Sequence, residues 1–138
     1  MSRKVERKKI LIIELEPEMR IFLSNLLDTG EFEPILFEAG NENTEDFKKI
    51  SPELIILDAM IPKGGTFQIY RNLKRDEALK NIPVIMLSTL DQNFVFQYQI
   101  GQRYPSRKAL PKPEAYLEKP PEAGELLNLV RTVTEKKK

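Results

Sequence analysis

The sequence is most constrained by short apolar runs that are too short for helices and that each end at a polar or charged residue. Three of them are almost unbroken: Lys9–Ile13 (KILII), Leu54–Leu57 (LIIL) and Pro83–Leu87 (PVIML). Apolar runs without a polar alternation are typical of strands that are covered on both faces, as in parallel sheets. Two weaker strands are predicted at Pro34–Glu38, which its proline assigns to a sheet edge, and at Ala115–Glu118.

Helical patterns separate these strands. Pro17 stands where proline is favoured in a first helical turn, and an amphipathic stripe follows it until Gly30. The stripe consists of Met19, Phe22, Leu23, Leu26 and Leu27. Further helices are predicted over residues 43–50, 67–75 and 123–133. Strands that alternate with helices in this way predict an α/β fold with a doubly wound, five-stranded parallel sheet.

Composition limits the chemistry that this chain can perform. Its 138 residues fit one domain, and 22 Lys and Arg against 21 Asp and Glu leave a net charge of +1, which predicts no nucleic-acid partner. With no Cys and no His, the chain has no thiolate metal site, no imidazole base and no Ser-His-Asp triad. No apolar run suits a signal peptide or a membrane span, so we expect a cytoplasmic domain without membrane contact. We divide the chain into a basic tail at 1–8, a domain at 9–134 and a charged tail at 135–138.

Four chemically distinctive residues stand at or directly after the carboxyl ends of predicted strands. They are Glu14, Asp58, Ser88 and Lys119. In open parallel sheets, ligands bind outside the carboxyl ends of the strands. We therefore expect two acids, a hydroxyl and an ammonium to converge on one site.

This set resembles the receiver domain of two-component response regulators, over about Lys9 to Val133. The resemblance is carried by IELEPEMR, LIILDAMIP, PVIMLST and YLEKPP, in that order. It implies a flavodoxin-like sheet of strand order 2-1-3-4-5 and a domain that is not itself an enzyme. It also implies Asp58 as the phospho-acceptor, with Ser88 and Lys119 in the phosphate pocket.

The resemblance implies further features of the site and its partners. Glu14, Asp58 and Met60 would form a Mg²⁺ site, Lys119–Pro120 would be a cis peptide, and Tyr116 would be the switch aromatic. A histidine kinase or histidine phosphotransfer protein would supply the phosphoryl group. A downstream effector protein would receive the signal by protein–protein contact, and a homodimer is a further possibility under this resemblance.

Two stretches depart from the family pattern. Leu15 stands where the second acid of an acidic pair is usual, and because leucine offers no oxygen ligand, this predicts weak Mg²⁺ binding. Residues 90–114 are about nine positions longer than usual and combine clustered prolines with apolar residues at period two. We predict that this stretch lacks a regular four-turn helix and forms a contact surface. Its aromatic residues are Phe94, Phe96, Tyr98 and Tyr104.

Alternatives of other classes remain open from the sequence. A receiver-like module could signal by binding without phosphorylation, and Leu15 is the residue that favours it. A phosphatase with an Asp nucleophile, of the haloacid dehalogenase type, would need a second acid where Met60 stands. A flavodoxin-type flavin binder would need a Ser-, Thr- or Gly-rich loop after the first strand, where ELEPE is found.

Overall fold

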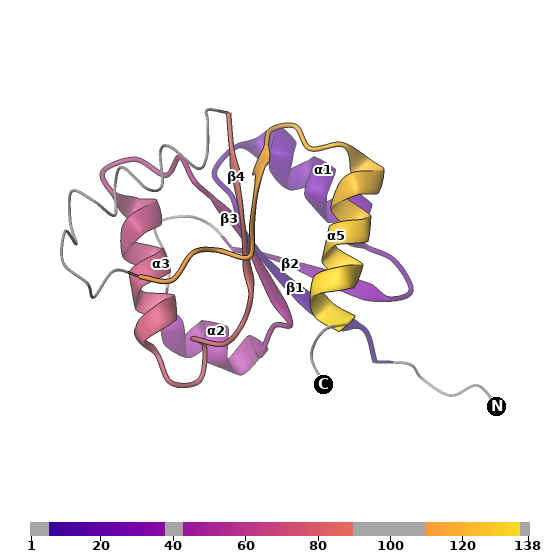
Figure 1. The fold of residues 1–138 in the computed structure, drawn as a ribbon. Coiled ribbons are helices and arrows are strands. Elements are labelled where there is room, and N and C mark those ends of the chain that lie inside the picture. The colour runs from indigo at the N-terminus through magenta and orange to yellow at the C-terminus, as the bar shows by residue number, and fades with distance from the viewer. Residues whose placement is uncertain (1–5, 38–42, 90–109, 136–138) are drawn as a thin grey trace.

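The computed structural model describes residues 6–37, 43–89 and 110–135 (Figure 1). Five strands form one parallel sheet in the order β2-β1-β3-β4-β5, which confirms the predicted order. The strands are β1 (Lys8–Ile13), β2 (Phe32–Phe37), β3 (Leu54–Asp58), β4 (Val84–Ser88) and β5 (Ala115–Glu118). The three almost unbroken apolar runs are thus the inner strands β1, β3 and β4.

Helices cover both faces of the sheet. The helices of the described chain are α1 (Pro17–Leu27), α2 (Thr44–Ile50), α3 (Gly65–Arg75) and α5 (Ala123–Glu135). In Figure 1, α1 and α5 lie on one side of the sheet and α2 and α3 on the other. This is the doubly wound arrangement that the alternation of strands and helices predicts.

The continuous apolar character of the inner strands follows from this layering. Successive side chains of a strand point to opposite faces, so each face receives every second residue. Ile10 and Ile12 pack into the core under α1 and α5, whereas Leu11 and Ile13 pack into the core under α2 and α3. All four side chains are fully buried.

The element boundaries differ slightly from those predicted. The edge position of β2 is confirmed, but the strand begins at Phe32 and continues through Pro34, which pairs in register with Ile10. An edge strand tolerates proline because one of its sides needs no ladder hydrogen bonds. Asn43 caps α2, because its side chain accepts a hydrogen bond from the Glu45 amide.

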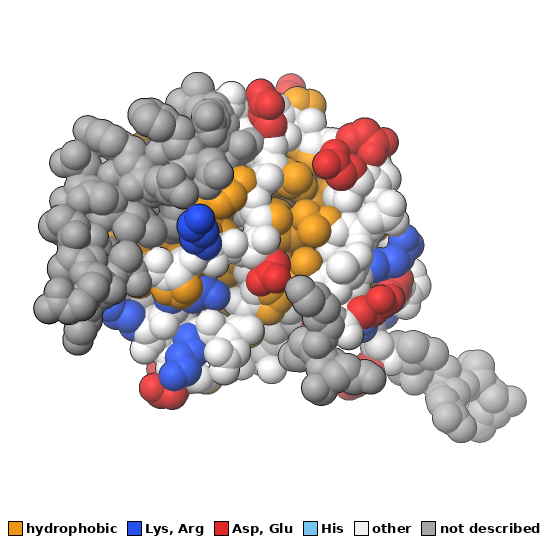
Figure 2. All heavy atoms as spheres, in the orientation of Figure 1, with side chains coloured by type: hydrophobic (Ala, Val, Ile, Leu, Met, Phe, Trp, Pro, Cys, Tyr) orange, Lys and Arg blue, Asp and Glu red, His pale blue; other side chains and the backbone are white. Residues whose placement is uncertain are grey.

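The long connection before β5 is only partly described. The predicted absence of a regular helix at 90–114 falls mostly on residues 90–109, which lie outside the described residues, as do Phe94, Phe96, Tyr98 and Tyr104. Residues 110–114 are irregular, and Leu110 packs on the core under α2 and α3. On the face shown in Figure 2, apolar side chains of the described residues are exposed between β5 and α5. Across the described ranges, no helix is long and apolar enough to span a membrane.

Candidate functional site

The carboxyl end of the sheet gathers the four residues that the sequence singles out. Glu14 follows β1, Asp58 and Ser88 end β3 and β4, and Lys119 follows β5. All are buried, with exposed fractions of 1%, 1%, 0% and 8%. Buried charges at this level of exposure require partners.

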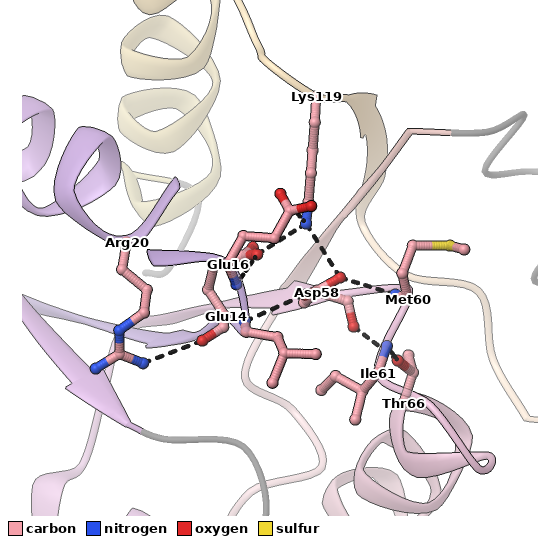
Figure 3. A network of polar contacts seen from close by, with 9 residues as sticks. Glu14, Glu16, Arg20, Asp58, Met60, Ile61, Thr66 and Lys119 are labelled. Atoms are coloured by element: carbon pink, nitrogen blue, oxygen red, sulfur yellow. Dashed lines mark hydrogen bonds and ion pairs between the residues drawn. The ribbon is translucent and has the colours of Figure 1, made fainter. Parts of the chain in front are cut away.

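Lys119 is the centre of an ion cluster (Figure 3). Its Nζ lies 2.8 Å from Glu14 Oε2, 3.2 Å from Asp58 Oδ1 and 3.4 Å from Glu16 Oε1. Its backbone amide donates to the Ser88 carbonyl at 2.8 Å, so the residue after β5 is tied to the end of β4. The Lys119–Pro120 peptide is cis, as predicted. Residues far apart in sequence are thus joined through one ammonium group.

The Asp58 carboxylate is oriented by backbone donors as well as by Lys119. Oδ1 accepts a hydrogen bond from the Met60 amide at 2.8 Å, and Oδ2 accepts one from the Leu15 amide at 3.2 Å. Each oxygen therefore has a fixed donor. This fixes the direction in which the carboxylate presents its remaining lone pairs.

Glu14 is the less well satisfied of the two buried acids. Oε2 accepts hydrogen bonds from Lys119 and from the Glu16 amide at 3.1 Å, but buried Oε1 has no hydrogen-bond partner among the described residues. Burial raises the pKa of Glu14 to about 7; the hydrogen bond from Lys119 offsets part of this, and the negative charge of Asp58 adds to it.

At Lys119, in contrast to Glu14, the charged partners outweigh burial. Burial by itself would lower the pKa of its ammonium, but the hydrogen bond and charge of Glu14, followed by those of Asp58, outweigh burial and raise the pKa. The ammonium is therefore held in its charged form. A compact, permanent positive charge lies beside both carboxylates.

The site offers suitable oxygen atoms for a divalent cation, but few carboxylate groups to balance its charge. The unpartnered Glu14 Oε1 and the Asp58 carboxylate are the hard oxygen donors that Mg²⁺ prefers. Leu15 and Met60 extend exposed apolar side chains next to them, 45% and 39% exposed. Within the described ranges, no cluster of three or more His, Cys, Asp or Glu side chains is arranged to hold a metal. The donor atoms thus suit Mg²⁺ in type, but because few of them are carboxylates we expect weak binding.

Two residues at the start of α1 make contacts in the site that their sequence positions do not predict. Glu16, which directly precedes Pro17, is the N-cap residue of α1 and also reaches Lys119. Arg20 donates through Nη1 to the Glu14 carbonyl at 3.0 Å and to the Phe37 carbonyl at 3.2 Å. It ties the ends of β1 and β2 together, and nothing in its sequence context indicated this.

A third residue that the sequence analysis missed is Thr66, in the first turn of α3. Its buried hydroxyl donates to the Asp58 carbonyl at 2.7 Å and accepts from the Ile61 amide at 3.0 Å. In the sequence, the available signal was a hydroxyl residue eight positions after Asp58. The turn between the two residues brings them together in the structure.

Tyr116 lies on β5 and packs, half-buried, on the core under α2 and α3. Burial raises the pKa of its phenol to about 12. Its neighbour in that core, Tyr70, donates its hydroxyl to the Pro111 carbonyl at 2.6 Å. Tyr116 is thus integrated into packing, and its role as a switch stays a prediction.

Comparison with known proteins supplies the family. The model of the response regulator receiver domain matches residues 10–131, nearly the whole chain. The chain belongs to this family. It is therefore a receiver domain of the two-component type, and the resemblance seen in the strand-end motifs is confirmed.

Individual relatives agree with this assignment. The chain is 32% identical over 81 residues, 59% of its length, to the phosphate regulon transcriptional regulatory protein PhoB of Escherichia coli. It is 30% identical to a response regulator receiver modulated diguanylate cyclase from Pelobacter carbinolicus, with a TM-score of 0.69 and coverage of 93% of this chain and 92% of that one. The chain spans only part of the length of the first curated relatives it matches. It covers 35% of PhoB and 5% of the hybrid signal transduction histidine kinase D of Dictyostelium discoideum.

One solved structure of the same fold was determined with a metal. It is the receiver domain of a sensor histidine kinase from Pseudomonas aeruginosa, with a magnesium ion coordinated in its active site cleft. It aligns with a TM-score of 0.75 at 17% identity, over 95% of this chain and 100% of that one. At this identity the likeness concerns the fold alone.

Proposed function

We propose that Asp58 is the phospho-acceptor of this receiver domain. The observation that carries the proposal is the contact of its carboxylate with the Lys119 ammonium, 3.2 Å away at the carboxyl end of the central strands. A buried carboxylate with a fixed orientation and an adjacent permanent cation is suited to forming an acyl phosphate.

The reaction transfers a phosphoryl group from a phosphohistidine of a kinase or phosphotransfer protein. An Asp58 oxygen attacks phosphorus, a P–O bond forms and the P–N bond of the donor breaks. The electron pair of the broken bond stays on the imidazole, which leaves neutral when its other ring nitrogen is protonated. Lys119 balances the added negative charge, and the Ser88 hydroxyl at the end of β4 would donate to a phosphoryl oxygen.

Glu14 and Asp58, with Met60 at the rim, are the residues that would hold Mg²⁺. When bound, the metal would orient the phosphoryl group and neutralise its charge. Of the chain's own groups, Lys119 favours the ionised form of Glu14 by pairing with Oε2, and this offsets part of the effect of burial. Because Leu15 adds no charge, we expect weak metal affinity.

Output would pass by protein–protein contact to a downstream effector, and the domain itself would catalyse no turnover of a separate substrate. We also propose the domain boundaries of 9–134, with charged tails outside them. The family match over residues 10–131 supports this division.

Small-molecule phosphorylation tests the proposal. Acetyl phosphate with excess Mg²⁺ is expected to add one phosphoryl group to the wild type, detected by intact mass, and none to Asp58→Asn. The matched control is Asp46→Asn, on α2 away from the pocket, which should label like the wild type. Equal labelling of Asp58→Asn and the wild type would disprove the assignment.

A second candidate, a receiver-like module that signals without phosphorylation, has one observation in its favour. The Lys119 ammonium by itself balances part of the negative charge of the pocket, because it pairs with both buried acids. If folded wild-type protein neither labels nor changes its NMR spectrum with Mg²⁺ and beryllofluoride, this candidate replaces the first.

A further inference from the structure

A buried hydroxyl at the start of α3 ties the loop between β3 and α3 to the acceptor strand. Thr66 is 1% exposed, and its Oγ1 donates to the Asp58 carbonyl at 2.7 Å while accepting from the Ile61 amide at 3.0 Å. One side chain therefore connects the end of β3, the middle of the loop and the start of α3 (Figure 3).

The rest of the loop has a tightly defined path. Lys63 and Gly64 adopt left-handed backbone conformations, with φ of 60° and 71°, and the Gly65 amide donates to the Pro62 carbonyl at 3.0 Å. A side chain at Gly65 would collide with the side chain of Ile61. The turn thus returns the chain so closely that Thr66 reaches back to Asp58.

The same loop also touches the reactive end of the acceptor. The Met60 amide donates to Asp58 Oδ1 at 2.8 Å, and this is the oxygen that Lys119 contacts. Asp58 is consequently held by one loop at two points. Thr66 holds its backbone carbonyl, and Met60 holds its carboxylate.

We propose that Thr66 is a positioning residue for phosphorylation of Asp58: its hydroxyl fixes the loop so that the Met60 amide orients the acceptor oxygen. Without the hydroxyl, the Ile61 amide and the Asp58 carbonyl lose a buried partner, and the Met60 amide moves relative to Oδ1. The consequence is a less well oriented nucleophile, and misorientation of a reacting group is costly to rate. The kinetic part of this inference rests on the proposed function, whereas the part concerning the loop does not.

The test compares Thr66→Val, which keeps the shape but removes the hydrogen bonds, with Thr66→Ser, which keeps the hydroxyl. Thr134→Val is the matched control, because Thr134 is also buried and donates to the Val130 carbonyl at 2.8 Å, but it lies on α5 away from the loop. Thr66→Ala, which leaves room for water, takes the place of Thr66→Val if that variant does not fold.

Two readouts are combined: amide hydrogen exchange of Met60 and Ile61, and the rate of labelling by acetyl phosphate. Thr66→Val is expected to speed exchange at both amides by about tenfold and to slow labelling by about tenfold, corresponding to the loss of roughly one hydrogen bond to the acceptor loop. Thr66→Ser should restore both values to within about twofold of the wild type. Thr134→Val should change neither rate, because its hydroxyl bonds only within α5.

Several outcomes would overturn the inference. Unchanged exchange at Met60 in Thr66→Val would show that the hydroxyl does not act through this amide. Equal slowing of labelling by Thr134→Val would reduce Thr66 to a general contribution to stability. If the wild type does not label at all, the proposed function fails, and hydrogen exchange at Met60 and Ile61 alone decides the role of Thr66.

Discussion

The two halves of the pocket differ in how completely their polar groups are satisfied. On the β3 side, both oxygens of Asp58 accept backbone hydrogen bonds, and Thr66 engages the carbonyl of the same residue. On the β1 side, Glu14 buries an oxygen that has no partner in the described chain, and the next residue is the exposed Leu15. The carboxylate oxygens and the carbonyl of the acceptor Asp58 have partners, whereas the β1 side of the described chain has an unpartnered oxygen and lacks a second acid directly after Glu14 for a metal.

This difference indicates that the two tasks are structurally separable. The acceptor is oriented by backbone amides and by the loop into α3, none of which depends on an acid after β1. Two groups join the halves: the Lys119 ammonium, which contacts Glu14 and Asp58, and the Leu15 backbone amide, which donates to Asp58 Oδ2. Four perturbations test how far the separation holds.

Removal of the shared cation should have the largest effect. Lys119→Met leaves two buried carboxylates without their ammonium, and breaking a buried ion pair in this way costs about 3–5 kcal/mol of unfolding free energy. The measurement is urea unfolding at pH 8, where Glu14 is ionised, with the exposed Lys112→Met as control. A loss as small as that of the control would mean that the two halves do not share this cation energetically.

The pH dependence of stability should come from the β1 half. Since burial raises the folded-state pKa of Glu14 from 4.5 to about 7, the folded protein keeps a proton between these values that the unfolded chain has released. The contribution of Glu14 to stability is therefore greatest below pH 4.5 and falls as the pH rises to 7, by at most about 3 kcal/mol. Unfolding of wild type and Glu14→Gln across this range measures it. Parallel curves for the two proteins would contradict the raised pKa.

Loosening the backbone of the β1 half should cost less. Arg20→Met removes donors to the Glu14 and Phe37 carbonyls, and hydrogen bonds from a charged group contribute about 1.5–3 kcal/mol. Arg131→Met, which loses an exposed pair with Glu31, is the control and should cost about 0–1 kcal/mol. If the halves are separable, hydrogen exchange at the Met60 amide stays unchanged in Arg20→Met.

Restoring an acid to the β1 half should change the free energy least, and its effect should be confined to Mg²⁺ binding and to the labelling that depends on it. Leu15→Asp is expected to tighten Mg²⁺ binding by at least about tenfold and to speed labelling by acetyl phosphate. Ile21→Asp adds the same charge at an exposed apolar position of α1 and controls for general electrostatics. Wild-type affinity equal to that of Leu15→Asp would show that Glu16 or another group already compensates.

Much of this site was predictable because a parallel sheet places strand ends at one edge. Four strand ends sufficed to predict that Glu14, Asp58 and Lys119 meet, and the structure brings these three within hydrogen-bonding or ion-pair distance. The prediction needed only the length and apolar character of each strand. It did not need the conformation of any loop.

The contacts of Thr66 and Glu16 were not predictable from the sequence, because they depend on how the chain turns outside the regular elements. Thr66 reaches Asp58 because Lys63 and Gly64 turn the chain through left-handed conformations, which apolar periodicity does not encode. Glu16 reaches Lys119 across 103 positions, so its local context as a helix start revealed only part of its role. The sequence predicts the start of β2 at Pro34 and not at Phe32, because proline weakens the strand pattern there.

The long separation between the members of the ion cluster has a consequence for how the domain assembles. Glu14 and Lys119 lie 105 positions apart, so their contact closes a long loop and requires a loss of chain entropy. A chain in which β1 and β3 have paired but β5 has not docked holds two neighbouring acids without their cation. Such acids take up protons, and a protonated carboxyl is a poor nucleophile. The chemical competence of Asp58 therefore depends on the docking of β5, which lies far from β1 and β3 in the sequence.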